Sequence, residues 1–207
     1  MASEREQARL IDRREAIRRV SALLGGVALV GGSALLTACE RELPRAAASG
    51  VGVGTFTTED IGFLDEVAET ILPETKTPGA KAAQVGAFMA LMVTDTYDER
   101  DQQIFRDGMR KLDAACQTMH TVSFMAATPQ QRLALLEQLD REQKAYMDAR
   151  AGDAPAHYFR MMKELALLGY FTSEIGYTKA MRYVEAPGRL DPCVPYTPGE
   201  TTWAPHA

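Results

Sequence analysis

The spacing of apolar residues between positions 57 and 186 predicts a helical bundle. Apolar side chains recur there at intervals of three and four residues, which is the period of one face of an α-helix. No alternating pattern longer than a few residues indicates a strand. The predicted fold class is therefore all-α, a compact helical bundle of about five to six helices. The expected stripes are Ile61, Leu64, Ala68 and Ile71; Val85, Phe88, Met89 and Met92; Phe105, Met109, Leu112, Cys116 and Met119; Leu133, Leu136 and Leu139.

Capping residues and prolines predict where these helices begin and end. Thr57 and Thr128 are typical N-caps, and Pro129 occupies the favoured first helical position after Thr128. The stretch "LPETKTPGA" ends the first helix, because its two prolines and its glycine cannot continue one. A separate short polar helix is expected over residues 141–150.

The most apolar helix is expected to begin near Pro155 and to run on past Gly176. Its apolar residues cover more than one face, so we expect it to pass through the middle of the bundle. Gly169 and Gly176 are seven residues apart and would share one side of it. Each glycine costs about 1 kcal/mol inside a helix. A neighbouring backbone that approaches closely, from this chain or from a partner, would justify that cost.

Two segments around the bundle lack helical periodicity. Residues 40–56 are small and glycine-rich, which is typical of a flexible tether. Residues 187–207 form an extended proline-rich C-terminal tail, because prolines at this density favour polyproline-like chain. The tail would be disordered or lie along another surface, with Tyr196 and Trp203 as anchors. The helical domain is thus expected over residues 57–186.

Residues 1–39 have the layout of an export signal. Arginine pairs precede residues 20–38, which carry no charge. The pair Arg13-Arg14 and a moderately apolar, glycine-diluted core resemble a twin-arginine signal, which exports proteins already folded. Ala16 and Asp12 depart from the usual twin-arginine pattern.

The end of this leader resembles a bacterial lipobox. Leu36-Thr37-Ala38-Cys39 would make Cys39 the lipidated N-terminal residue of a membrane-associated protein. Two alternatives stay open: cleavage after the small residues 46–48, or an uncleaved apolar helix. The body lies outside the cytoplasm in each case, and we expect a periplasmic location.

Cysteine usage adds one structural expectation. If Cys39 carries lipid, an exported chain with Cys116 and Cys193 left over favours a disulfide between them. The alternative is two separate thiols, with Cys116 as a small core residue.

Charge and motifs argue against several functions. The chain has a net charge of −5, and its first 38 residues carry +2, so the remainder carries −7 and is a poor nucleic-acid ligand. Its three histidines, His120, His157 and His206, are far apart, and no nucleotide, hydrolase or zinc motif occurs. Acidic pairs such as Asp65-Glu66 are interpreted as ordinary surface charges. We therefore expect no catalytic, cofactor-binding or metal site in this chain.

Two stretches of the sequence resemble the gluconate 2-dehydrogenase subunit 3 family. In the first, "AETILPETKTPGAKAAQVGAFMALMV", a helix ends in Ile-Leu-Pro, a Thr-x-Thr-Pro-Gly-Ala turn follows, and the next helix carries Val85 and Phe88. The second, "LALLGYFTSEIGYTKAMRYVEAPG", includes Gly169, Tyr170 and Gly176. The resemblance spans roughly residues 57–203.

The resemblance implies an accessory role. Members of this family are non-catalytic small subunits of membrane-bound sugar or sugar-acid dehydrogenases. Their large subunit binds FAD in a glucose–methanol–choline (GMC) type fold, and a multihaem cytochrome c passes electrons on. The small subunit often carries the twin-arginine signal that exports the folded, FAD-loaded complex. On this interpretation Gly169, Gly176, Tyr196 and Trp203 are the partner-binding candidates.

Two other functions stay open at this point. One is a free-standing periplasmic lipoprotein that binds a small ligand in a pocket lined by Tyr158, Tyr170 and Tyr177. The other is an enzyme in its own right, because residues that are distant in sequence can meet in the fold. The sequence does not identify the substrate of the partner dehydrogenase.

Overall fold

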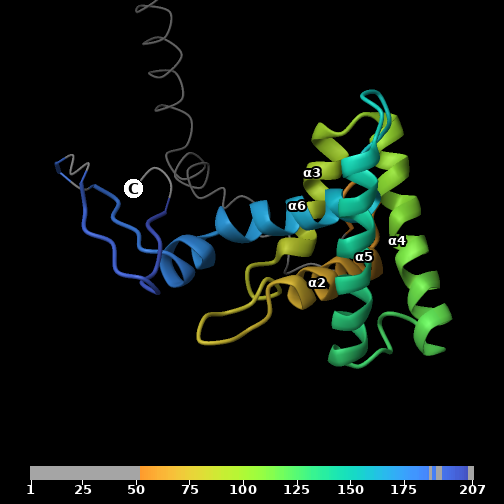
Figure 1. The fold of residues 1–207 in the computed structure, drawn as a ribbon, viewed down its shortest axis with the longest axis horizontal. Helices are drawn as coiled ribbons and strands as arrows, with labels where there is room; N and C mark the ends of the chain where they lie inside the picture. Colours follow the sequence, from red (N-terminus) through yellow and green to blue (C-terminus); the bar gives the residue numbers. More distant parts are fainter. Residues whose placement is uncertain (1–51, 187, 190–192, 205–207) are drawn as a thin grey trace, which may run out of the picture. The chain divides into compact units, whose positions relative to one another are not determined.

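Five α-helices and one π-helical turn make up the secondary structure of the residues that the computed structural model describes, which are 52–186, 188–189 and 193–204 (Figure 1). No strand occurs among them, although they contain two isolated β-bridges. The prediction of an all-α fold with about five to six helices is confirmed. The helices are α2 (Thr58–Ile71), α3 (Val85–Thr96), α4 (Glu99–His120), α5 (Pro129–Ala149), α6 (Tyr158–Phe171) and the π-helix η3 (Gly176–Ala180).

Two helices begin where the sequence predicts. Thr57 caps α2 in a capping box, in which its hydroxyl accepts the Asp60 N–H at 3.2 Å and the Asp60 carboxylate accepts the Thr57 N–H at 2.8 Å. Thr128 and Gln131 form the same reciprocal pair at the start of α5, with Pro129 in its first turn. These caps satisfy backbone N–H groups that have no partner within the helix.

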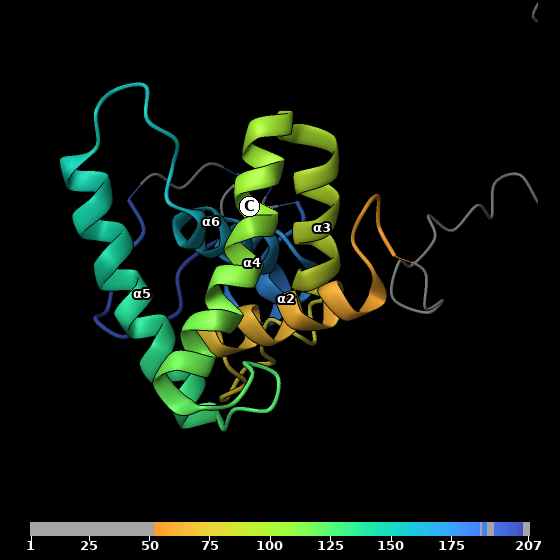
Figure 2. The same cartoon turned by 90° about the vertical axis from the view of Figure 1, so that its right-hand side faces the viewer.

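Helix α6 is the central element of the bundle. It contacts α2, α3, α4 and α5 (Figure 1 and Figure 2). Its buried side chains lie on more than one face, because Met161 and Leu165 are buried in addition to Phe159, Met162 and Ala166. A helix that is buried on several sides is more apolar than an amphipathic surface helix, as the sequence indicated. The expectation that this segment passes through the middle is confirmed.

The central helix is shorter than predicted. It ends at Phe171, and a separate helical segment leads into η3. The Ser173 hydroxyl donates to the Tyr170 carbonyl at 2.7 Å and accepts the Gly176 N–H at 3.0 Å, so a serine side chain takes over bonds that helix backbone would otherwise make. Gly169 and Gly176 therefore do not share one helix face, and that prediction was wrong.

Helix α5 is longer than predicted. It continues without a break to Ala149, so the separate polar helix expected over residues 141–150 does not exist. Its buried stripe is also shifted from the expected one, because Leu135 is buried together with Leu136 and Leu139 while Leu133 is 48% exposed. On α4, Met119 also lies outside the core. It is 39% exposed and follows Cys116, the last buried residue before the helix ends at His120.

The folded region starts before Thr57. Val53 and Phe56 exchange two backbone hydrogen bonds of 3.0 and 2.9 Å, and Phe56 is 3% exposed, with its ring edge against Phe105. Residues 53–56, which end the predicted tether, thus contribute to the core. The leader residues Arg13, Arg14 and Cys39 lie outside the described residues. Within the described ranges, no helix is both long and apolar enough to cross a membrane.

The contrast between Leu133 and Leu136 gives a paired test of the core. Leu136→Ala should lower the free energy of unfolding by about 2–5 kcal/mol, because it opens a cavity in packed apolar surroundings. Leu133→Ala removes the same atoms from an exposed position and should change it by no more than about 0.5 kcal/mol. Urea denaturation of the two variants measures both values, and equal losses would contradict the register of α5.

Candidate functional site

The two stretches singled out in the sequence meet along the C-terminal half of α6. The Tyr170 hydroxyl donates a 2.7 Å hydrogen bond to the carbonyl oxygen of Pro78, 92 residues away. Gly169 faces Phe88 of α3, where a Cβ atom would lie 2.6 Å from the ring carbon Cδ1. A close approach at Gly169 is thus made within the chain, although by the Phe88 side chain and not by the expected backbone. This glycine is buried and not available to a partner.

Gly176 serves the chain in a similar way. It is buried in η3, and a Cβ atom there would collide with the carbonyl oxygen of Tyr170. The absence of a side chain lets the segment after α6 fold back against the helix end. Both glycines proposed as partner contacts are therefore internal packing positions.

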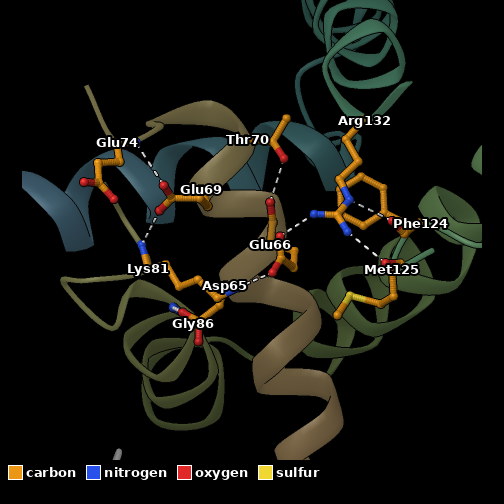
Figure 3. A network of polar contacts seen from close by, with 10 residues as sticks. All are labelled: Asp65, Glu66, Glu69, Thr70, Glu74, Lys81, Gly86, Phe124, Met125 and Arg132. Atoms are coloured by element: carbon orange, nitrogen blue, oxygen red, sulfur yellow. Dashed lines mark hydrogen bonds and ion pairs between the residues drawn. The ribbon is translucent and has the colours of Figure 1, made fainter. Parts of the chain in front are cut away.

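A row of carboxylates on α2 holds the loop between α2 and α3, which spans residues 72–84 (Figure 3). Glu69 accepts backbone N–H bonds from Glu74 at 2.9 Å and from Lys81 at 2.7 Å. Asp65 accepts the N–H of Gly86, in the first turn of α3, at 2.8 Å. A loop without regular structure needs such acceptors for its backbone. The loop is consequently fixed from both ends by side chains of one helix.

Glu66 joins this loop to a second one. Its two carboxylate oxygens pair with Lys81 and with Arg132 of α5. The Arg132 guanidinium also donates to the carbonyl oxygens of Phe124 at 2.9 Å and Met125 at 2.8 Å, which belong to the α4–α5 connection (Figure 3). The Glu66 and Arg132 side chains are only 17% and 14% exposed, so this pair is better shielded than a surface salt bridge.

The two adjacent carboxylates have opposite pKa shifts. Burial raises the pKa of Asp65, and this effect outweighs the backbone hydrogen bond from Gly86 and the charge of Lys81. Burial acts on Glu66 in the same direction, but the hydrogen bonds and charges of Lys81 and Arg132 lower its pKa below the ordinary value. Sequence reasoning treated this acidic pair as ordinary surface charge. Its partners lie 15 to 66 residues away, and no local signal points to them.

The predicted disulfide is not formed. Cys116 and Cys193 are both free: Cys116 is fully buried on the core face of α4, whereas Cys193 is exposed in the tail. The alternative interpretation of Cys116 as a small core residue describes what is observed. Burial also raises the pKa of the Cys116 thiol, which disfavours the reactive thiolate.

The two aromatic residues of the tail have different environments. Tyr196 is 71% exposed, which is the largest value among the large apolar side chains of the described residues. Trp203 is 43% exposed, and the guanidinium of Arg182 lies 4.5 Å from its ring centroid. Tyr196 is thus available to another molecule, while Trp203 already has an intramolecular partner.

His157 has a structural role. It caps α6, with Nδ1 accepting the Phe159 N–H at 3.2 Å, and its ring stacks on Tyr158 at 4.5 Å. Burial lowers the pKa of His157, which keeps the imidazole neutral and able to accept that bond.

Two shallow grooves mark the surface. One, of about 410 Å³, lies between α2 and α4 and is lined by Asp60, Phe63, Met109, Arg110, Asp113, Ala114 and Gln117. The other, of about 270 Å³, is lined by Thr172, Ser173, Glu174, Tyr177, Thr178 and Tyr183. The expected ligand pocket of three tyrosines does not correspond to either groove, because Tyr158 and Tyr170 line neither. Among the described residues, no group of three or more His, Cys, Asp or Glu side chains is placed to hold a metal ion.

The comparison with protein families agrees with the resemblance found in the sequence. The family model described as gluconate 2-dehydrogenase subunit 3 matches residues 58–188, which is more than half of the chain. This range includes the carboxylates of α2, the loop that they hold, and both glycines at α6. No curated protein and no solved structure matches the chain significantly.

The opposite pKa shifts of Asp65 and Glu66 predict opposite effects of charge removal. Glu66→Gln leaves Arg132 without its carboxylate and should lower the free energy of unfolding by about 1–3 kcal/mol at neutral pH. Asp65→Asn keeps an oxygen for the Gly86 N–H and removes a charge that burial disfavours, so it should be neutral or slightly stabilising there.

The pH dependence of the Glu66 effect follows from the sign of its shift. A carboxyl whose pKa is lowered by folding stabilises the fold fully above its ordinary pKa of 4.5, and this contribution is lost as the pH falls through the folded-state value. The difference between Glu66→Gln and the wild type should therefore shrink in urea denaturation at about pH 3. A difference that stays constant down to that pH would argue against the ion pairs.

Proposed function

Because the chain belongs to the gluconate 2-dehydrogenase subunit 3 family, we propose that it is the non-catalytic small subunit of an exported sugar or sugar-acid dehydrogenase complex. The family match over residues 58–188 is the observation that carries this proposal. The family name indicates a subunit of a dehydrogenase complex. The non-catalytic role, the cofactor of the partner and the site of action are parts of the proposal.

The use of the polar side chains supports a non-catalytic role. Asp65 and Glu69 accept backbone bonds that hold the loop of residues 72–84, and Glu66 is paired with two cations. The Tyr170 hydroxyl is directed at a backbone carbonyl of the same loop. These three carboxylates and this hydroxyl thus have structural partners within the chain.

In this proposal the chemistry resides in the partners. A large subunit of the GMC type would hold FAD and oxidise the substrate, and a multihaem cytochrome c would accept the electrons. In this proposal the leader is the export signal and the membrane anchor. Arg13 and Arg14 direct twin-arginine export of the folded complex, and lipid on Cys39 attaches the complex to the periplasmic side of the membrane. Export of a folded complex suits a flavoprotein that is loaded with FAD before it leaves the cytoplasm.

Purification from the native membrane tests the assignment. A tagged full-length chain should bring down a yellow, FAD-containing protein of larger mass, identified by its flavin spectrum and by mass spectrometry. The flavin should leave with the larger protein when the subunits are separated. A chain that purifies alone and monodisperse, or one that keeps a flavin by itself, would contradict the proposal.

The leader gives a prediction about export. Replacing Arg13 and Arg14 by Lys should leave the dehydrogenase activity of the partner in the cytoplasmic fraction, because the twin-arginine route depends on both arginines. The second arginine pair offers a matched control: Arg18→Lys with Arg19→Lys makes the same chemical change outside the motif and should leave export unchanged. Periplasmic activity at the wild-type level in the Arg13/Arg14 variant would show that another route is used.

A further inference from the structure

The C-terminal tail is attached to the folded domain by a clasp at Arg182. The backbone N–H of Arg182 donates to the Thr202 carbonyl at 2.9 Å, and the Arg182 carbonyl accepts the Ala204 N–H at 2.8 Å. These two bonds make a parallel β-bridge between Arg182 and Trp203. The Arg182 side chain stacks over the Trp203 ring and bonds Glu200 at 3.2 Å. Backbone and side chain of one residue therefore hold the far end of the tail next to η3.

A tight turn precedes this clasp. The Glu200 N–H donates to the Thr197 carbonyl at 3.1 Å, Pro198 is the second residue of the turn, and Gly199 has φ +88°. This combination is typical of a type II turn, which needs a residue with positive φ at its third position. The turn restricts the chain directly after residues 193–197, and the clasp restricts it a few residues further on.

Residues 193–197, Cys-Val-Pro-Tyr-Thr, lead into the turn and the clasp and make up what we call the docking segment. The segment has no regular secondary structure, and Val194 and Tyr196 are 48% and 71% exposed. Pro195 limits the backbone between them. Exposed apolar side chains that adjoin a restrained part of the chain have less conformational entropy to lose on binding, which favours their use as an interaction surface.

The chemistry of the docking segment indicates the kind of partner. No charged residue occurs from Pro192 to Gly199, although the body of the chain is strongly acidic. A segment that binds a lipid surface or a phosphate backbone carries Lys or Arg, and this one carries neither. Tyrosine is a frequent anchor at protein interfaces, because its ring buries a large area while its hydroxyl needs one acceptor.

We propose that the docking segment binds the flavin-bearing large subunit, with Tyr196 inserted into an apolar pocket that offers a hydrogen-bond acceptor to its hydroxyl. This inference rests on the proposed function, since it assigns a contact within that complex. Arg182 is a positioning residue here, because it acts through the clasp. Trp203, which the sequence also suggested as an anchor, holds the tail to its own domain.

The test measures the affinity of the full chain for the purified FAD-containing subunit. Tyr196→Ala should weaken binding by about 30-fold or more, as expected for a hot-spot tyrosine, and Tyr196→Phe should weaken it less because the ring stays. Leu133→Ala is the matched control: it removes an apolar side chain of 48% exposure on α5 and should leave the affinity unchanged.

Two further measurements separate anchoring from positioning. Arg182→Lys keeps the charge but loses the planar stack on Trp203, so it should weaken binding several-fold while the unfolding transition of the helices stays at the wild-type temperature. Because the docking segment is uncharged, the effect of Tyr196→Ala should be the same at low and high salt.

Each other outcome has a defined meaning. If the wild-type chain binds the large subunit and Tyr196→Ala binds equally well, the docking inference is overturned and the proposed function stands. A Tyr196→Ala variant that leaves the complex intact but abolishes self-association of the chain also overturns the inference. So does one that leaves the complex intact but abolishes binding of the chain to vesicles of anionic and neutral phospholipids. If the wild-type chain binds no dehydrogenase subunit, both proposals fail.

Discussion

The burial of α6 on several sides is the constraint on which the rest of this structure depends. A helix that contacts four others must place small residues where neighbouring groups approach closely and must satisfy every polar group that it carries inward. Gly169 meets the first requirement by admitting Phe88. Tyr170 meets the second through the carbonyl oxygen of Pro78, and this bond brings the α2–α3 loop onto the central helix.

The loop in turn explains the carboxylates of α2. Its proline- and glycine-rich sequence cannot form a helix, so its backbone donors need side-chain acceptors. Glu69 and Asp65 provide them, and Glu66 ties the same region to Arg132 and the α4–α5 connection. Side chains that resemble an acid–base cluster in isolation are therefore parts of the support for a buried helix. This arrangement agrees with the proposed non-catalytic role of the chain.

The C-terminal tail is held by a few local contacts and not by a packed core. The position of its far end depends on Arg182, which stacks on Trp203, and on a proline–glycine turn. Its most exposed aromatic residue, Tyr196, makes neither of these contacts and is 71% exposed. The domain thus combines a packed interior with an exposed apolar segment, residues 193–197, in its tail. In the proposed complex the interior would keep the subunit folded and the exposed segment would bind the partner.

The sequence by itself determined the fold class, the N-caps Thr57 and Thr128 and the apolar character of the central helix, because helix period, caps and prolines act over a few neighbouring residues. It did not determine the end of α6 at Phe171, where the Ser173 hydroxyl competes with helix backbone. Nor did it decide between a disulfide and two thiols, because only packing places Cys116 in the core and Cys193 at the surface. The pairing of Glu66 with Arg132, 66 residues apart, was likewise decided by the tertiary structure. A glutamate reads the same in the sequence whether its carboxylate is solvated or paired with a buried cation. Only the packing of the helices decides between these two environments.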